Sequence, residues 1–153
     1  MKSKQWLQLH QLDDKLLVYN TLKNLSPPTD GWLRHIRKSL GMTLEQLGNK
    51  LGITKQSARA IEQREKEGTL TIQGLKQAAS AMDMQLVYVL LPKDESVETM
   101  IYRKAEELAK MLVQRTSHSM LLEDQEISYQ RKEKAISERA LDIAHNLPKA
   151  LWD

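Results

Sequence analysis

The segment Met42–Arg64, which reads MTLEQLGNKLGITKQSARAIEQR, constrains the fold more than any other part of the chain. Its apolar residues recur at helical spacing on both sides of a short break, which predicts one helix over about 43–50 and a second over about 54–64. Gly52 lies in the break and suits the left-handed backbone that ends many helices. Two helices joined by a turn of about three or four residues that contains Gly are typical of a helix-turn-helix motif.

The composition of the whole chain narrows the remaining possibilities. Its 153 residues are 41% hydrophobic and 28% charged, which is enough apolar material for a packed core. Cys is absent, so disulfides and zinc–thiolate sites are excluded. No segment approaches the roughly 20 apolar residues of a membrane span and no signal peptide is visible, so we expect a cytoplasmic protein without a membrane partner. The pI of about 9.1 is compatible with binding to nucleic acid.

The residues before this motif predict two further helices separated by a break. Apolar residues recur at three- and four-residue steps over 3–25, which predicts an N-terminal helix. This helix packs either on its own domain or on a second subunit, and the pattern leaves both open. The break over 26–31 contains two prolines and a glycine. The next helix is predicted over 32–40, and its basic side chains Arg34, Arg37 and Lys38 are expected to point outward.

The pattern changes after the motif and after one more predicted helix that ends at Met82. Residues 85–91 form a β-branched and apolar run that Pro92 stops, which predicts a single β-strand rather than a buried helix segment. A lone strand leaves its edges unpaired, and no second strand is evident in the sequence. We therefore expect this strand to pair with the same strand of a second copy, so that the protein is a homodimer.

The C-terminal part is expected to be helical throughout. Residues 93–147 contain neither Gly nor Pro, and Asp94 or Ser96 suits the cap of a first long helix. The cluster 116–119 (Thr-Ser-His-Ser) is expected to break or re-cap that helix. The whole chain is then mainly α, in three segments: an N-terminal helical arm (1–26), the helix-turn-helix domain with its trailing strand (27–92) and a C-terminal helical region (93–153).

The second helix of the motif carries side chains suited to reading DNA. Such a helix presents its N-terminal residues to base edges in the major groove. Gln pairs with adenine and Lys or Arg with guanine, each pair contributing about 1–3 kcal/mol of discrimination. The bland alternative is that these are ordinary solvated side chains. The candidate DNA-binding residues, including those suited to phosphate contacts, are Thr43, Thr54, Lys55, Gln56, Ser57, Arg59 and Arg64.

Catalysis is not expected from this sequence. The histidines are scattered without the spacing of metal ligands, and no glycine-rich loop could cradle a phosphate. We therefore expect no enzyme activity, no metal and no cofactor. The histidines are His10, His35, His118 and His145.

Residues 32–83 resemble the lambda-repressor-like (Xre-type) helix-turn-helix family. The resemblance implies a dimer that binds a palindromic operator in double-stranded DNA. With its trailing strand, the segment is similar to antitoxins of HipB type, in which two such strands pair across the dimer. Leu44 stands where phage-repressor-type domains often carry a phosphate-binding Gln, so that contact is not expected here.

A longer stretch, roughly residues 9–125, resembles the family named mobile mystery protein A. The resemblance rests on PPTDGWLRHIRKSLGM, the helix-turn-helix, MDMQLVYVLLP and RTSHSMLLEDQ. Members are encoded beside a Fic-domain protein, mobile mystery protein B, and are regarded as its antitoxin. The resemblance therefore implies a toxin–antitoxin pair in which this chain inhibits a Fic-domain AMP-transferase and represses its own operon. The alternative is a plain dimeric transcriptional repressor.

The same resemblance singles out Ser119 and Glu123. Antitoxins of Fic proteins carry a helix with the pattern Ser/Thr-x-x-x-Glu-Gly/Asn, which this chain matches except that Asp124 stands last. On a helix, Ser119 and Glu123 would lie one turn apart on one face. The carboxylate would form a two-pronged bond with the Fic arginine that otherwise holds the ATP γ-phosphate. The bland alternative is a surface pair on an amphipathic helix.

Overall fold

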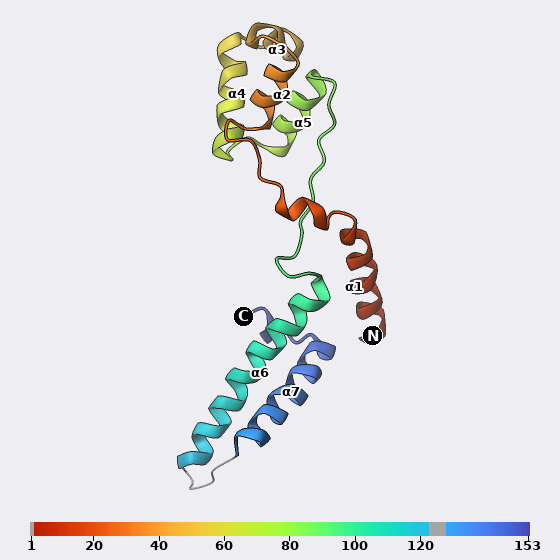
Figure 1. Ribbon diagram of the computed structural model, residues 1–153, viewed down its shortest axis with the longest axis vertical. Helices are drawn as coiled ribbons and strands as arrows, with labels where there is room; N and C mark the ends of the chain where they lie inside the picture. Colours follow the sequence, from red (N-terminus) through yellow and green to blue (C-terminus); the bar gives the residue numbers. More distant parts are fainter. Residues whose placement is uncertain (1, 123–127) are drawn as a thin grey trace. The chain divides into compact units, whose positions relative to one another are not determined.

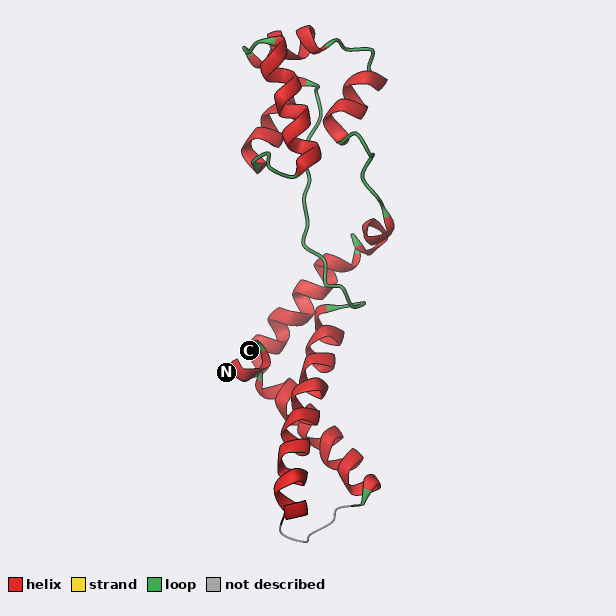
Figure 2. Ribbon diagram, turned by 90° about the vertical axis from the view of Figure 1, so that its left-hand side faces the viewer, coloured by secondary structure: helices red, strands yellow, loops and turns green. Residues whose placement is uncertain are grey.

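The computed structural model describes residues 2–122 and 128–153, and in these ranges the chain forms helices and no strand (Figures 1 and 2). It divides into two compact units. One combines Met1–Lys23 with Leu90–Asp153, and the other consists of Asn24–Val89. Within the described ranges, no helix has the length and apolar character needed to cross a membrane.

The unit Asn24–Val89 contains the predicted motif. Its elements are α2 (Trp32–Ser39), α3 (Leu44–Leu51), α4 (Lys55–Glu67) and α5 (Ile72–Ala81). The two helices predicted on either side of Gly52 are confirmed, although α4 runs one turn beyond the predicted end, to the left-handed Gly68. Its core is formed by Leu33, Leu47, Ala58, Ala78 and Met82.

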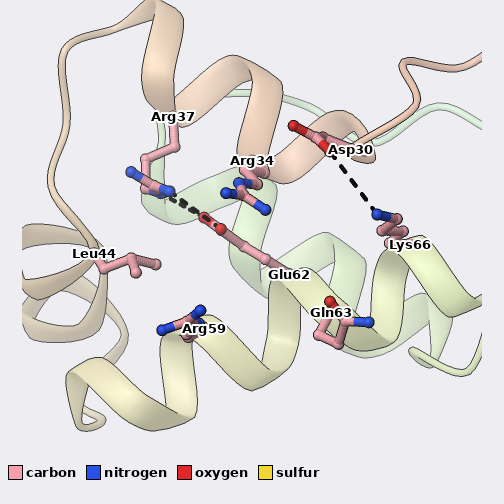
Figure 3. Close-up of a pocket in the computed structure, with 8 residues that line it drawn as sticks. All are labelled: Asp30, Arg34, Arg37, Leu44, Arg59, Glu62, Gln63 and Lys66. Carbon is pink, nitrogen blue, oxygen red and sulfur yellow. Dashed lines mark hydrogen bonds and ion pairs between the residues drawn. The ribbon is translucent and has the colours of Figure 1, made fainter.

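A buried ion pair joins α2 to α4. Arg37 and Glu62 are only 7% and 4% exposed, and the guanidinium binds both carboxylate oxygens through Nε and Nη2 (Figure 3). Arg37 Nη1 also donates to the carbonyl of Met42, 2.9 Å away, just before α3. The expectation that Arg37 points outward is therefore wrong, because a carboxylate on the inner face of α4 needs a buried cation as its partner.

A second carboxylate of α4 caps the start of α2. The N-cap residue Gly31 has no side chain to accept the first backbone N–H groups of that helix. The carboxylate of Glu65 takes the role of a capping side chain. Its two oxygens accept hydrogen bonds from the backbone N–H groups of Trp32 (3.0 Å) and Leu33 (3.3 Å). Gly31 has φ +83, which favours glycine, and a Cβ there would displace the Glu65 carboxylate from its capping position.

The strand predicted over 85–91 does not form in this chain. Residues 84–92 belong to neither helix nor strand. Within the described ranges no neighbouring segment offers the ladder of hydrogen bonds that would make this run a strand. The side chains of Val87, Tyr88 and Leu90 are exposed, Leu90 by 87%. Pairing with a second copy stays a prediction.

The other unit is assembled from both ends of the chain. Its elements are α1 (Lys2–Leu17), the 3₁₀ turn η1 (Asn20–Asn24, whose last residue belongs to the other unit), α6 (Val97–Leu122), α7 (Tyr129–Asn146) and the 3₁₀ turn η2 (Lys149–Leu151). α1 lies against α6 and α7, and α7 runs back beside α6 (Figures 1 and 2). The single helix predicted over 3–25 is therefore wrong beyond Leu17.

Contacts with the segment before α6 accompany this change from α1 to η1. Asn20 Nδ2 donates to the carbonyl of Glu95 at 3.4 Å, and Lys23 Nζ donates to the carbonyl of Asp94. The Asp94 carboxylate is in turn held by two nitrogens of Arg103, at 3.0 and 2.9 Å. The hydrogen bond and positive charge of Arg103 lower the pKa of Asp94 below its ordinary value. These polar contacts hold the segment at residues 94–95, where the chain returns to this unit after Val89.

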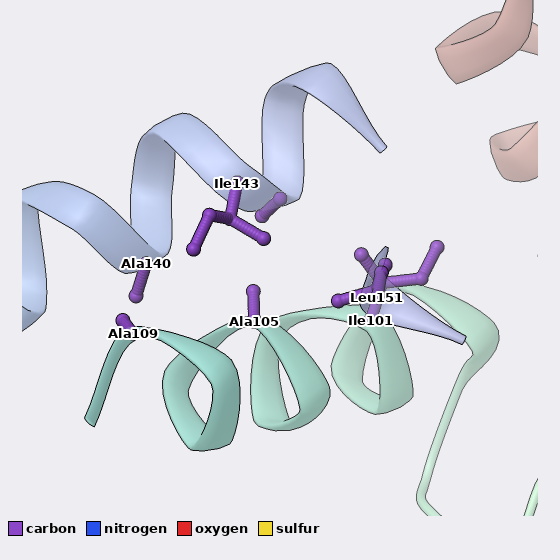
Figure 4. Packing of buried hydrophobic residues seen from close by; sticks show 7 residues of the cluster. Ile101, Ala105, Ala109, Ala140, Ile143 and Leu151 are labelled. Carbon is purple, nitrogen blue, oxygen red and sulfur yellow. The ribbon is translucent and has the colours of Figure 1, made fainter. Parts of the chain in front are cut away.

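Small residues let α6 and α7 approach closely. Ala105 and Ala109 of α6 face Ala140 and Ile143 of α7, with Ile101 and Leu151 closing one end (Figure 4). Alanine adds little bulk, so the two helices pack with backbone near backbone. Leu151 is 5% exposed, so the C-terminal turn belongs to this core.

The predicted break at residues 116–119 is wrong. α6 continues through the cluster to Leu122. The hydroxyls of Thr116 and Ser119 donate to the carbonyls of Leu112 (3.1 Å) and Arg115 (3.2 Å), four residues earlier. Hydroxyls bonded in this way follow the helix instead of competing with it.

The first turn of α6 is capped from two directions. Asp13 of α1 accepts from the backbone N–H groups of Val97 (2.7 Å) and Glu98 (3.0 Å). The remaining two N–H groups of that turn donate to the hydroxyl and the carbonyl of Ser96. The N–H groups of Val97, Glu98 and Thr99, which have no partner within the helix, are therefore all satisfied, two of them by Asp13 of another helix.

Removal of one partner of the buried pair should destabilise the helix-turn-helix unit strongly. Glu62→Ala leaves the Arg37 guanidinium buried without its partner, at an expected cost of about 3–5 kcal/mol. Hydrogen exchange should then become faster over residues 32–82 and stay unchanged over 97–118, because the latter lie in the other unit. The control Glu67→Ala removes an exposed carboxylate of the same helix. The double variant Arg37→Met/Glu62→Leu should restore most protection, and a Glu62→Ala protein with native exchange would contradict this account.

Removal of the Asp13 carboxylate, which caps α6, should destabilise the unit that contains α1, α6 and α7. Asp13→Ala should destabilise it by about 1 kcal/mol, the usual cost of removing an N-cap, and expose α6 amides to exchange. Asp13→Asn keeps one acceptor oxygen and should lose less. The neighbouring exposed Asp14→Ala serves as the matched control, and equal effects at the two positions would show that the cap contributes nothing.

Candidate nucleic-acid interface

Two glycines with different roles shape the turn between α3 and α4. Gly52 ends α3 with φ +69, the left-handed conformation predicted for it. Gly48 is needed for space: a Cβ there would lie 2.8 Å from the carbonyl oxygen of Ile53 and 3.2 Å from that of Thr54. The backbone that enters α4 therefore passes directly over α3, which fixes where α4 begins.

Both helices of the motif start at a threonine cap. Thr43 accepts from the backbone N–H of Gln46 at 3.1 Å, while the Gln46 side chain accepts from the Thr43 N–H at 2.8 Å, which completes the predicted capping box. Thr54 accepts from the backbone N–H of Ser57 at 3.1 Å and donates to its hydroxyl at 3.0 Å. The side chain of Ser57 is thereby held against the start of α4.

The first turn of α4 presents its polar side chains to solvent. Lys55, Gln56 and Ser57 are exposed, and Arg59 is exposed one turn after Lys55. Arg64 is also exposed, but it lies nine residues beyond Lys55, about 13–14 Å along the axis, where its Nε donates to the carbonyl of Ala60 at 3.4 Å. The structure therefore groups the candidates Thr54–Ser57 and Arg59 at one end of α4 and leaves Arg64 toward the other.

The charge of α4 is distributed unevenly along its length. Its first turn contains no acidic residue. Its glutamates lie in the second half, and each is engaged: Glu62 with Arg37, Glu65 with the start of α2, and Glu67 with Gln63 at 2.6 Å. The N-terminal end keeps Lys55 and the partial positive charge of the helix dipole, so it suits a polyanion.

Sequence reasoning missed Arg37 and Glu62 as parts of the framework that orients this helix. The available signal was the position of Glu62, four residues after the inward Ala58 and hence on the same face. A carboxylate on a buried face requires a cation or hydrogen-bond donors nearby. Arg37 is the cation that the structure supplies.

The second set of predicted site residues is only partly described. Ser119 lies near the end of α6 with its side chain exposed. Glu123 lies outside the described residues, so the expected one-turn pairing with Ser119 stays a prediction. In the described ranges, no three His, Asp or Glu side chains come together in a way that could hold a metal ion.

Comparison with known proteins agrees with this geometry over part of the chain. Residues 33–89 match the family model described as helix-turn-helix, which spans α2 to α5 and the segment after α5. Neither the curated proteins nor the solved structures contain a match to the chain. Residues 33–89 are therefore an Xre-like helix-turn-helix domain, the kind of domain that DNA-binding transcription regulators use.

Proposed function

We propose that this protein is a transcription regulator that reads a palindromic operator as a homodimer and represses its own operon. The observation that carries the proposal is the exposed first turn of α4, which Gly48, Gly52 and the Thr54 cap hold in a defined position. In this role Lys55 and Gln56 contact base edges, while Thr43 and the helix starts contact phosphates. The activity is binding, without catalysis.

The residues after α5 supply the contact surface of the proposed dimer. Val87, Tyr88 and Leu90 are exposed apolar side chains in a run whose backbone has no strand partner within the described ranges. Strand pairing between two copies would satisfy the unpaired backbone groups of this run. A dimer built in this way places two α4 helices on one duplex, with half-sites about 34–36 Å apart or a multiple of that.

Selection of bound sequences from a pool of random duplexes should yield an inverted repeat. The variant Lys55→Ala/Gln56→Ala should then fail to select that sequence, because each base contact it removes costs about 1–3 kcal/mol of discrimination. The control Asn49→Ala/Lys50→Ala removes the same kinds of side chain from the exposed last turn of α3 and should bind normally. Undiminished affinity of the α4 variant would show that another surface reads the DNA.

A second function, neutralisation of a Fic-domain AMP-transferase, is proposed for the end of α6. It rests on the resemblance to mobile mystery protein A and on the exposure of the Ser119 side chain. In this role Glu123 binds the arginine that positions the ATP γ-phosphate, so that AMP transfer stops without any chemistry by this chain. A plain dimeric repressor, whose α6 and α7 only support the fold, is the competing proposal.

Co-expression with the product of the neighbouring gene, which the antitoxin proposal expects to be a Fic-domain protein, separates the two proposals. Under the antitoxin proposal the two proteins co-purify, and AMP transfer is silent until this chain is removed. Glu123→Ala should then release AMP transfer by removing the carboxylate, without changing DNA binding. Glu133→Ala, an exposed glutamate of α7, is the control. Absence of a complex, or full neutralisation by Glu123→Ala, would favour the plain repressor.

A further inference from the structure

A charged hollow of about 290 Å³ lies between α2 and α4 (Figure 3). We call it the arginine hollow. Helices α2 and α4 supply most of its lining, and Leu44 contributes the first residue of α3. The residues that line it are Asp30, Arg34, Arg37, Leu44, Arg59, Glu62, Gln63 and Lys66.

The cations of the arginine hollow are not all neutralised by its acids. Glu62 binds Arg37, and Asp30 lies 3.9 Å from Lys66 in a half-exposed pair. Arg34 and Arg59 have no acidic partner among the residues that the structure describes. Four cations and two carboxylates line the hollow, so Arg34 and Arg59 leave it with an excess of positive charge that an anion would reduce.

The arginine hollow adjoins the end of α4 proposed to read DNA. Arg59 lies one turn after Lys55, so a duplex contacted by Lys55 and Gln56 would bring its backbone close to Arg59. The Leu44 side chain lines the same hollow and cannot donate a hydrogen bond. The floor is rigid, because Arg37 is fixed by Glu62 and by the carbonyl of Met42.

We propose that the arginine hollow binds one phosphate of the DNA backbone, held by Arg34 from α2 and Arg59 from α4. The proposal rests on the proposed DNA-binding function and adds to it a phosphate contact that no base-reading residue supplies. A guanidinium offers two parallel N–H donors to phosphate oxygens, so two such groups from different helices can hold one phosphate and fix α2 and α4 on the duplex. The contact positions the domain and carries no base preference.

The test measures how binding of the full chain to a short fluorescent duplex of random sequence depends on NaCl. The slope of log K against log [NaCl] falls in magnitude by about 0.9 for each phosphate that the protein no longer neutralises. Arg34→Gln and Arg59→Gln should each weaken binding about tenfold or more at low salt. Because both hold the same phosphate, the slope of the double variant should fall by only about 0.9 in total. Lys76→Gln removes an exposed cation of α5 outside the hollow and should change neither quantity by as much.

The outcomes separate the proposal from the function on which it rests. A wild-type chain that binds no duplex overturns the DNA-binding function itself. A wild-type chain that binds, with both arginine variants matching Lys76→Gln, overturns the phosphate contact and leaves DNA binding intact. A third arm compares thermal unfolding in sodium phosphate and in NaCl at equal ionic strength. Stabilisation by phosphate that either arginine variant abolishes, without any change in the DNA slope, would assign the hollow to free phosphate and overturn the backbone contact.

Discussion

The buried contact between Arg37 and Glu62 is the constraint on which the helix-turn-helix unit depends. It joins α2 to α4, and through the carbonyl of Met42 it reaches the turn that leads into α3. Burial of two charges is expensive, and apolar replacements of similar volume are often as stable. The pair is therefore better understood as a directional contact, because a guanidinium can donate two hydrogen bonds to one carboxylate in only a few relative orientations. It holds the inner face of α4 in register with α2 while the outer face stays free for recognition.

The motif could be predicted from sequence because its determinants are local. Thr43, Gly52 and Thr54 act within a few residues of where they stand, and their spacing shows what they do. Arg37 could not be placed in this way. An arginine in a short basic helix looks solvent-exposed in the sequence, because its buried partner Glu62 stands 25 residues later. The continuous α6 was missed for the opposite reason. Hydroxyls that suit a cap also bond back to their own helix, and the sequence alone does not say which they do.

The same long-range device appears at two helix starts. Glu65 caps α2 and Asp13 caps α6, each as a carboxylate from another helix that accepts two backbone N–H groups. Both lie outside the windows in which cap patterns are recognised, so neither could be read from sequence. The trailing run over 85–91 shows a related limit. Its composition favours a strand, but strand formation depends on a neighbouring strand, which the described residues of this chain do not supply.

The contact of Asp13 with α6 also has a consequence for the order in which the protein forms. α1 leaves the ribosome before α6 and α7, the helices on which it packs, and these are made only after the whole unit Asn24–Val89. Domains fold as units during synthesis, so the helix-turn-helix unit completes its core while α1 is still waiting for its partners. The nascent chain thus has a folded helix-turn-helix unit before the unit of α1, α6 and α7 is complete. The interval between the two is set by the rate of translation.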